Sequence, residues 1–92
     1  MYRGHGDAPM RKLVEYMAQG LVEQPDAVQV REGRSDRYFA AFHLTVAPDD
    51  FGKVIGRQGR VAKAMRSILR AAGARQGKNI ALEIHQVPSA ES

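Results

Sequence analysis

The residues whose types and spacing best suit chemistry are two glycines, Gly56 and Gly59, in the segment GKVIGRQGR at residues 52–60. Without a Cβ atom, both positions let another chain approach the backbone closely. A helix that begins directly after them points its free N–H groups and its partial positive charge at the turn. The basic residues beside the pair are Arg57, Arg60 and Lys63. The pattern therefore predicts a clamp for phosphate groups.

Charge is segregated along the chain in a way that favours the same interpretation. The chain has 92 residues, a net charge of +4 and a pI near 9.9. Residues 51–82 hold eight Lys or Arg and no Asp or Glu, which makes this stretch +8; the rest holds 6 basic and 10 acidic residues, or −4, and the two add to +4. A basic block without acids attracts phosphate, although a solvated helix face is the alternative.

Two other glycine-loop motifs are excluded by the residues present. A P-loop needs Gly-x-x-x-x-Gly-Lys followed by Ser or Thr, and the chain has no such string. A dinucleotide-binding fingerprint that ends at Gly59 needs glycine at position 54, which is Val54. Gly-x-x-Gly also occurs in ordinary turns between helices. The motif therefore indicates a phosphate clamp only together with the basic block around it.

Composition removes several classes of protein. The chain has no Cys, which excludes disulfides, thiolate nucleophiles and Cys-ligated metals. The longest apolar run covers residues 38–42, far short of the roughly 20 residues of a membrane helix. Residues 1–9 lack the apolar segment of a signal peptide. We therefore expect a single cytoplasmic domain without a deep catalytic cleft.

Catalysis and metal binding have little support in the sequence. The histidines, His5, His43 and His85, lack metal-ligand spacing and are interpreted as structural. Ser35 and Ser67 lack the context of an activated nucleophile. The carboxylates cluster at turns and helix starts, with no pair suited to acid–base work. The sequence predicts no enzyme, no bound metal and no cofactor.

The elements that position the glycine pair begin with a helix and two strands. A helix from about Met10 carries a buried stripe at helical spacing and stops at residues 24–26. The stripe consists of Leu13, Val14, Met17 and Leu21. Strands near residues 28–31 and at 38–46, joined by a turn at 33–37, are predicted to pair antiparallel. In the second strand, the even positions form one face, and the odd positions from Phe39 to Thr45 form the other.

The second half predicts two helices and a strand. Residues 48–50 cap a short helix at 51–55, and a longer helix runs from about residue 60 to Gly77. Its apolar face comprises Val61, Ala64, Met65, Ile68, Leu69 and Ala72, and its basic face comprises Arg60, Lys63, Arg66 and Arg70. The strand at 80–84 follows a helical crossover and is expected to pair in parallel with strand 38–46.

The predicted fold class is therefore α+β, in the order α-β-β-α-α-β. A three-stranded mixed sheet carries three helices on one face. Residues 10–87 form the domain, between a flexible leader at 1–9 and a flexible tail at 88–92.

The run VIGRQGRVAKAMR at residues 54–66 resembles the signature of KH domains. Residues 10–87 as a whole resemble the KhpA family of small bacterial single-KH proteins, with further similarity at LVE (13–15), VAPDD (46–50) and GKN (77–79). The leader has no counterpart in the family pattern. The resemblance implies a type II KH fold that binds about four nucleotides of single-stranded RNA.

The resemblance also implies roles for individual residues and partners. The clamp consists of Gly56, Arg57, Gln58 and Gly59, with added positive charge from Lys53, Arg60 and Lys63. The apolar groove beside it is lined by Val54, Ile55 and Val61, with strand 38–46 as its far side. The family further implies a homodimer, or a heteromer with a larger KhpB (Jag/EloR) type protein, in post-transcriptional control as an RNA chaperone and in cell-envelope growth.

Two other functions stay open at this point. A protein-interaction module would dock a partner in the apolar groove or on a strand edge, and Phe39 on the sheet face away from the helices favours it. A ribosome-assembly factor would bind structured ribosomal RNA through the basic helix face. No membrane and no small-molecule substrate is expected.

Overall fold

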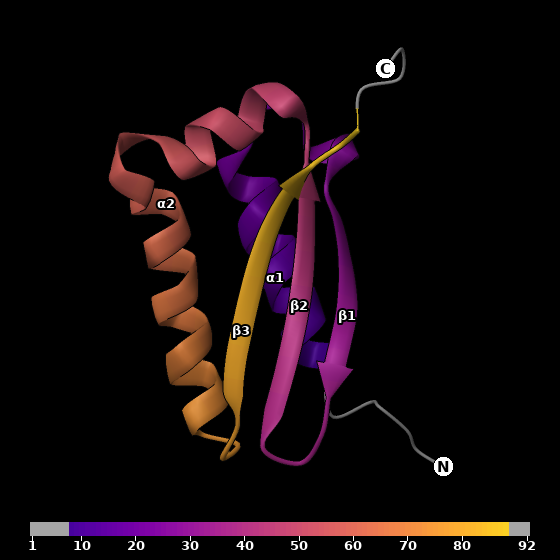
Figure 1. The fold of residues 1–92 in the computed structure, drawn as a ribbon, viewed down its shortest axis with the longest axis vertical. Helices are drawn as coiled ribbons and strands as arrows, with labels where there is room; N and C mark the ends of the chain where they lie inside the picture. Colours follow the sequence, from indigo (N-terminus) through magenta and orange to yellow (C-terminus); the bar gives the residue numbers. More distant parts are fainter. Residues whose placement is uncertain (1–7, 89–92) are drawn as a thin grey trace.

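The chain forms a three-stranded sheet with helices over one face, and within the described residues no helix covers the other face, called the open face below (Figure 1). The computed structural model describes residues 8–88, with residues 8, 9, 57 and 58 described by their backbone alone. Its elements are α1 (Ala8–Leu21), the 3-10 helix η1 (Pro25–Ala27), β1 (Gln29–Ser35), β2 (Phe39–Val46), α2 (Pro48–Ala74) and β3 (Asn79–Gln86). No helix in this part of the chain is both long and apolar enough to cross a membrane.

The predicted fold class and element order are confirmed, with one change of detail in the helices. The helices expected on either side of the glycine pair form one element, α2. Figure 1 shows that α2 bends sharply, so that residues 48–55 and residues 60–74 form two limbs in different directions. The bend keeps the predicted order of helix, turn and helix.

β2 is the central strand of the sheet, with β1 antiparallel on one side and β3 parallel on the other. Its side chains alternate between faces, as period-two geometry requires. The buried members, which face the helices, are Ala40, Phe42, Leu44 and Val46. Phe39, Ala41, His43 and Thr45 are half-buried on the open face, so the predicted alternation is confirmed.

The β1–β2 turn is shorter than the sequence indicated. β1 continues to Ser35 across an irregularity between Glu32 and Ser35, where residues 33–37 were predicted to be a turn. The turn is closed by Asp36, whose carboxylate accepts a hydrogen bond from the N–H of Tyr38 at 2.8 Å. Tyr38 is therefore an exposed turn residue and not the first buried residue of β2.

α1 packs on the sheet through a stripe shifted from the predicted one. The buried residues are Met10, Val14 and Ala18, four apart, while Leu13 and Met17 flank them. Leu21, expected in the core, keeps 54% of its surface exposed, because the stripe continues through Val22 after the helix has ended. α1 begins at Ala8, so its first two residues come from the predicted leader; residues 1–7 and 89–92 lie outside the described residues.

The first limb of α2 is attached to the chain that follows α1. Asp49 and Asp50 were predicted to cap this helix, but Ala47 is the N-cap residue and no side chain caps it. Asp50 is instead 1% exposed, and its two carboxylate oxygens accept hydrogen bonds from the N–H groups of Glu23 at 2.9 Å and Gln24 at 3.0 Å. A buried carboxylate with two such donors fixes where the glycine turn lies relative to α1.

The second limb ends at Ala74, three residues before the predicted end at Gly77. The chain leaves the helix through a turn in which Gly77 has φ +73° and Lys78 donates its N–H to the carbonyl oxygen of Gly73 at 2.9 Å. A Cβ atom on Gly73 would lie 2.7 Å from the Lys78 carbonyl oxygen and closer still to Ile80. Glycine at position 73 thus lets β3 start directly against the end of α2.

Candidate nucleic-acid interface

The glycine pair lies at the bend of α2 and faces open space. Gly59 has φ +68°, a left-handed conformation that side-chain-bearing residues adopt at a cost of about 1–2 kcal/mol. A Cβ atom built on Gly56 or on Gly59 would meet none of the described atoms within 4 Å, apart from the chain next to it. The backbone of the turn is therefore open to an approaching ligand at both glycines.

Basic side chains continue from the turn along the exposed side of the second limb. Arg60 and Lys63 are exposed there, as are Arg66 and Arg70 further along. The side chains of Arg57 and Gln58, which the sequence places in the clamp, lie outside what the structure describes. The described part of the turn thus combines open backbone with two nearby exposed cations, Arg60 and Lys63.

Lys53, on the first limb, has an acidic neighbour. Its Nζ atom lies 2.7 Å from the carboxylate of Glu23, and both side chains are exposed. The hydrogen bond to Glu23 raises the pKa of Lys53 above its ordinary value, because it stabilises the charged ammonium form. Because the pair is exposed, water screens it and a phosphate group can compete for Lys53 at little cost.

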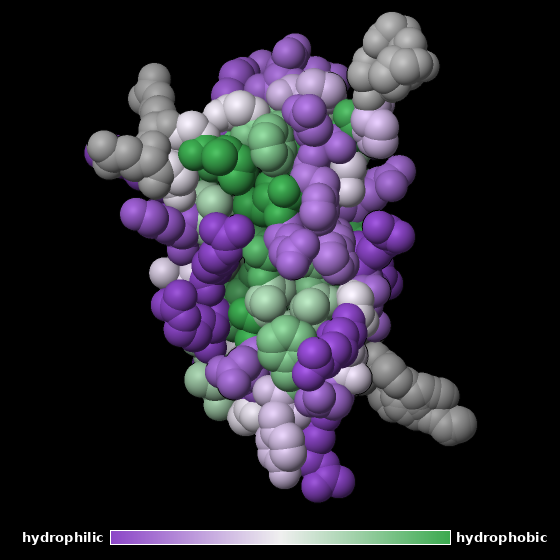
Figure 2. Space-filling model, in the orientation of Figure 1, coloured by the Kyte–Doolittle hydropathy of each residue, from purple (hydrophilic) through white to green (hydrophobic). Residues whose placement is uncertain are grey.

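The apolar residues predicted to line the groove differ in their exposure. Ile55 keeps 40% of its surface exposed, and Val61 is half-buried. Val54 is 3% exposed and belongs to the core, so it offers little surface to the groove. Figure 2 shows an apolar strip that begins beside the bend of α2 and runs down between α2 and β3. Ile55 and Val61 belong to the elements at its upper end.

The sequence predicted strand 38–46, which contains β2, as the far side of the groove. The strand on the far side of this strip is β3. β3 is the edge strand and lies between β2 and the second limb of α2 (Figure 1). Asn79 donates its N–H to the carbonyl oxygen of Tyr38, and Val87 donates its N–H to that of Val46, so these odd-numbered residues turn their backbone groups toward β2. Alternate residues of a strand turn their backbone groups to opposite edges. The carbonyl group of Leu82 consequently points to the free edge, toward α2.

Arg66 donates hydrogen bonds to that carbonyl group. Its guanidinium donates from Nε at 3.2 Å and from Nη2 at 3.0 Å to the carbonyl oxygen of Leu82. The sequence places Arg66 on a solvated basic face, and no local pattern indicates a partner 16 residues away. Arg66 therefore connects the helix after the glycine turn to the strand opposite it.

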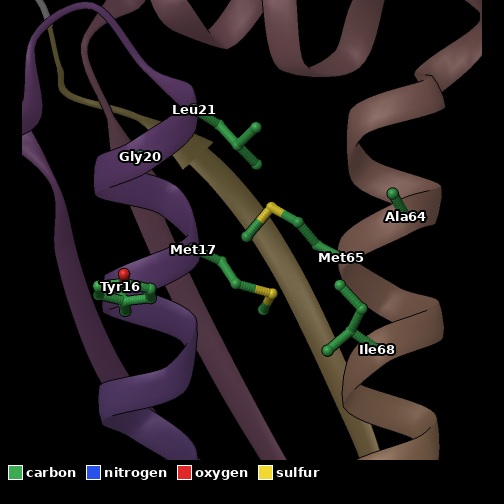
Figure 3. Close-up of a pocket in the computed structure, with 7 residues that line it drawn as sticks. All are labelled: Tyr16, Met17, Gly20, Leu21, Ala64, Met65 and Ile68. Carbon is green, nitrogen blue, oxygen red and sulfur yellow. The ribbon is translucent and has the colours of Figure 1, made fainter.

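A second apolar surface lies between the two helices. An open groove of about 370 Å³ is lined by Tyr16, Met17, Gly20, Leu21, Ala64, Met65 and Ile68. Figure 3 shows Met17 and Leu21 of α1 pointing toward Met65 and Ile68 of α2. Ile68 was predicted to be buried but is 48% exposed, and Ala64 is exposed as well. The apolar face of the second limb is wider than the part that α1 and the sheet cover.

A family model and several individual relatives of this chain belong to one family. The family model described as KhpA/KhpB, KH domain, matches residues 11–84. The chain is 45% identical over 75 residues to the RNA-binding protein KhpA of Clostridium acetobutylicum, which covers 82% of this chain and 99% of that protein. It is 48% identical over 75 residues to the KhpA of Halalkalibacterium halodurans, covering 82% and 97%. It is 43% identical over 75 residues to the KhpA of Aquifex aeolicus, covering 82% of this chain and 94% of that protein. No solved structure matches the chain significantly.

Proposed function

The chain belongs to the KhpA/KhpB family of KH domains, and on this premise we propose that it binds single-stranded RNA through the Gly56–Gly59 turn. The family is one of RNA-binding domains and not of enzymes. In KH domains the glycine turn clamps the backbone of about four nucleotides while the bases lie in an adjacent groove. The observation that carries the proposal is the open backbone at both glycines, at the end of an apolar strip.

The proposed division of labour follows from chemistry. The turn and the cations beside it, Arg60 and Lys63, neutralise phosphate groups, and the apolar strip accepts the flat faces of unpaired bases. Lys53 also binds a phosphate group when that group displaces Glu23 from the ion pair. Binding is then largely electrostatic, and the logarithm of the binding constant falls with the logarithm of salt by about 0.7 for each phosphate neutralised on a single strand.

The test compares two double variants by fluorescence anisotropy with labelled single-stranded RNA, duplex RNA and single-stranded DNA at two salt concentrations. In the first, Arg57→Asp and Gln58→Asp change the turn. In the second, Arg75→Asp and Gln76→Asp make the same chemical change in the exposed turn at the other end of α2. We expect the first variant to lose single-strand binding, with an unchanged circular dichroism spectrum and melting temperature, and the second to retain most of it.

Other results would favour the other functions. Equal loss in both double variants would mean that binding depends on net charge and not on the turn. Preference for the duplex would favour a factor that binds structured ribosomal RNA through the basic face of α2. A wild-type protein without RNA affinity would favour a protein-interaction module.

We also propose that the chain acts as a homodimer or with a KhpB-type partner. The groove between α1 and α2 supports this, because Tyr16, Leu21 and Ile68 keep large apolar areas in water. One KH module that holds a few phosphates binds weakly, and two linked modules on one RNA gain avidity. We propose that such a pair acts in post-transcriptional control.

A further inference from the structure

Three side chains on the open face of the sheet form a cluster that the proposed RNA site does not use. Nδ1 of His43 lies 3.1 Å from Nε2 of His85. The Oε1 atom of Glu83 lies 3.7 Å from each of these two nitrogens. The imidazole rings are stacked, with their centroids 5.3 Å apart. Two nitrogens and one carboxylate oxygen thus lie within 3.7 Å of one another.

Strand pairing brings these residues together across 42 positions of the sequence. β2 and β3 run in parallel with His43 opposite Glu83 and Thr45 opposite His85. Since side chains alternate between the two faces, all of them lie on the face away from the helices. The sequence, in which the histidines lack ligand spacing, gives no sign of this arrangement. His43 and His85, which the sequence indicated to be structural, thus lie together with Glu83 on the open face.

The distances suit a metal ion as well as they suit a hydrogen bond. Two imidazole nitrogens at 3.1 Å repel each other unless a proton lies between them, and a cation can take the place of that proton. For a tetrahedral Zn²⁺ with bonds of 2.0–2.2 Å, the ligand atoms lie about 3.3–3.6 Å apart. The observed separations of 3.1, 3.7 and 3.7 Å lie close to this range, and the imidazole rings must turn to aim both nitrogens at one ion.

We propose that His43, Glu83 and His85 bind one Zn²⁺ ion, with solvent in the fourth position. Two imidazoles and a carboxylate are typical ligands of zinc, whereas Ca²⁺ and Mg²⁺ prefer sites made of oxygen atoms. The site lies on β2 and β3 only, so the metal ion connects the central strand to the edge strand that borders the apolar strip.

The surroundings of His43 support a formed site. A Cβ atom on Gly33 of β1 would lie 2.8 Å from Nε2 of His43, so glycine at this position provides the space in which the ring lies. The charged residue next to it is Arg31, which pairs with His43 across β1 and β2 and is exposed. Glu83 balances part of the metal charge, and Arg31 can turn to solvent.

The test is isothermal titration of the full chain with ZnCl₂, with MgCl₂ as the comparison metal. We expect one Zn²⁺ per chain, no Mg²⁺ binding, and a higher melting temperature with Zn²⁺, because an ion that binds only the folded chain stabilises it. In nitrogen-15 NMR, Nδ1 of His43 and Nε2 of His85 should shift on addition of Zn²⁺. These shifts identify the ligand atoms independently of affinity.

Variants separate this site from other zinc binding. His43→Gln, His85→Gln and Glu83→Gln should each weaken Zn²⁺ binding by about tenfold or more, which is 1.4 kcal/mol or above. His5→Gln, which changes the histidine outside the cluster, should leave binding unchanged. Gly33→Ala should weaken binding by displacing the His43 ring, while His43 itself stays in the sequence.

Two results would overturn the proposal. The first is the absence of saturable Zn²⁺ binding by the wild-type chain. The second is binding that survives His43→Gln and His85→Gln but disappears in His5→Gln, which would assign the metal to the leader. Gly33, His43, Glu83 and His85 are exposed or half-buried, and the circular dichroism spectra of all variants report whether they fold.

Discussion

The guanidinium of Arg66 donates two hydrogen bonds to the carbonyl oxygen of Leu82. Arg66 belongs to the limb of α2 that follows the glycine turn, and Leu82 lies on the edge strand β3. The contact therefore joins the two elements on either side of the apolar strip at the free edge of the sheet. The separation of these elements depends in part on a side chain that the sequence assigns to a solvated basic face.

Arg66→Ala should lower the free energy of unfolding by about 1 kcal/mol, because the lost donors have charge but lie only partly buried. Arg66→Lys should recover less than half of this, since one ammonium group cannot reproduce the paired donors. Urea denaturation measures both effects. Arg70→Ala, four residues along the same exposed face, is the control and should change stability little; an equal loss at Arg70 would mean that helix propensity and not the contact is responsible.

Asp50→Asn should destabilise the fold by about 2 kcal/mol, because the amide replaces one of the two buried acceptors with a donor that faces an N–H group. Thermal and urea unfolding give the difference. The matched variant Asp49→Asn changes an exposed neighbour in the same helical turn and should cost far less. If the two variants were equally stable, the hydrogen bonds to Glu23 and Gln24 would not fix the first limb of α2.

Gly56→Ala and Gly59→Ala should separate conformational strain from ligand contact. Gly59→Ala should lose about 1–2 kcal/mol of stability, because alanine resists the positive φ at this position. Gly56→Ala has open space for its methyl group and should gain up to about 1 kcal/mol from helix propensity. Both should weaken single-stranded RNA binding in the anisotropy assay; full RNA affinity in Gly56→Ala would argue against close approach of the RNA backbone there.

Ile68→Lys should abolish self-association, since it places a charge in the groove between α1 and α2. Light scattering coupled to size-exclusion chromatography measures the mass of the particle across a concentration series. Ser67→Lys adds the same charge at the neighbouring exposed position, which does not line the groove, and should leave the mass unchanged. A wild-type protein that stays monomeric at all concentrations would remove the dimer from the proposed function.

Local patterns were enough to predict much of the fold. The alternation along β2 predicted which of its residues would be buried, and the glycine pair predicted the bend of α2 and an open turn. These predictions succeeded because each depends on residues that are neighbours in the sequence. Predictions failed where a residue has an apolar type but its burial depends on what another element covers, as for Leu21 and Ile68.

The sequence by itself determined the element types, the segregation of positive charge around the glycine turn, and the family. Only the tertiary structure decided that β3 lies beside α2, that Arg66 meets Leu82, and that the register of β2 and β3 brings His43, Glu83 and His85 within reach of one another. The physical reason is that charge and periodicity are local properties of the chain. Strand order and register are set by packing between distant segments, and a single strand does not carry that information.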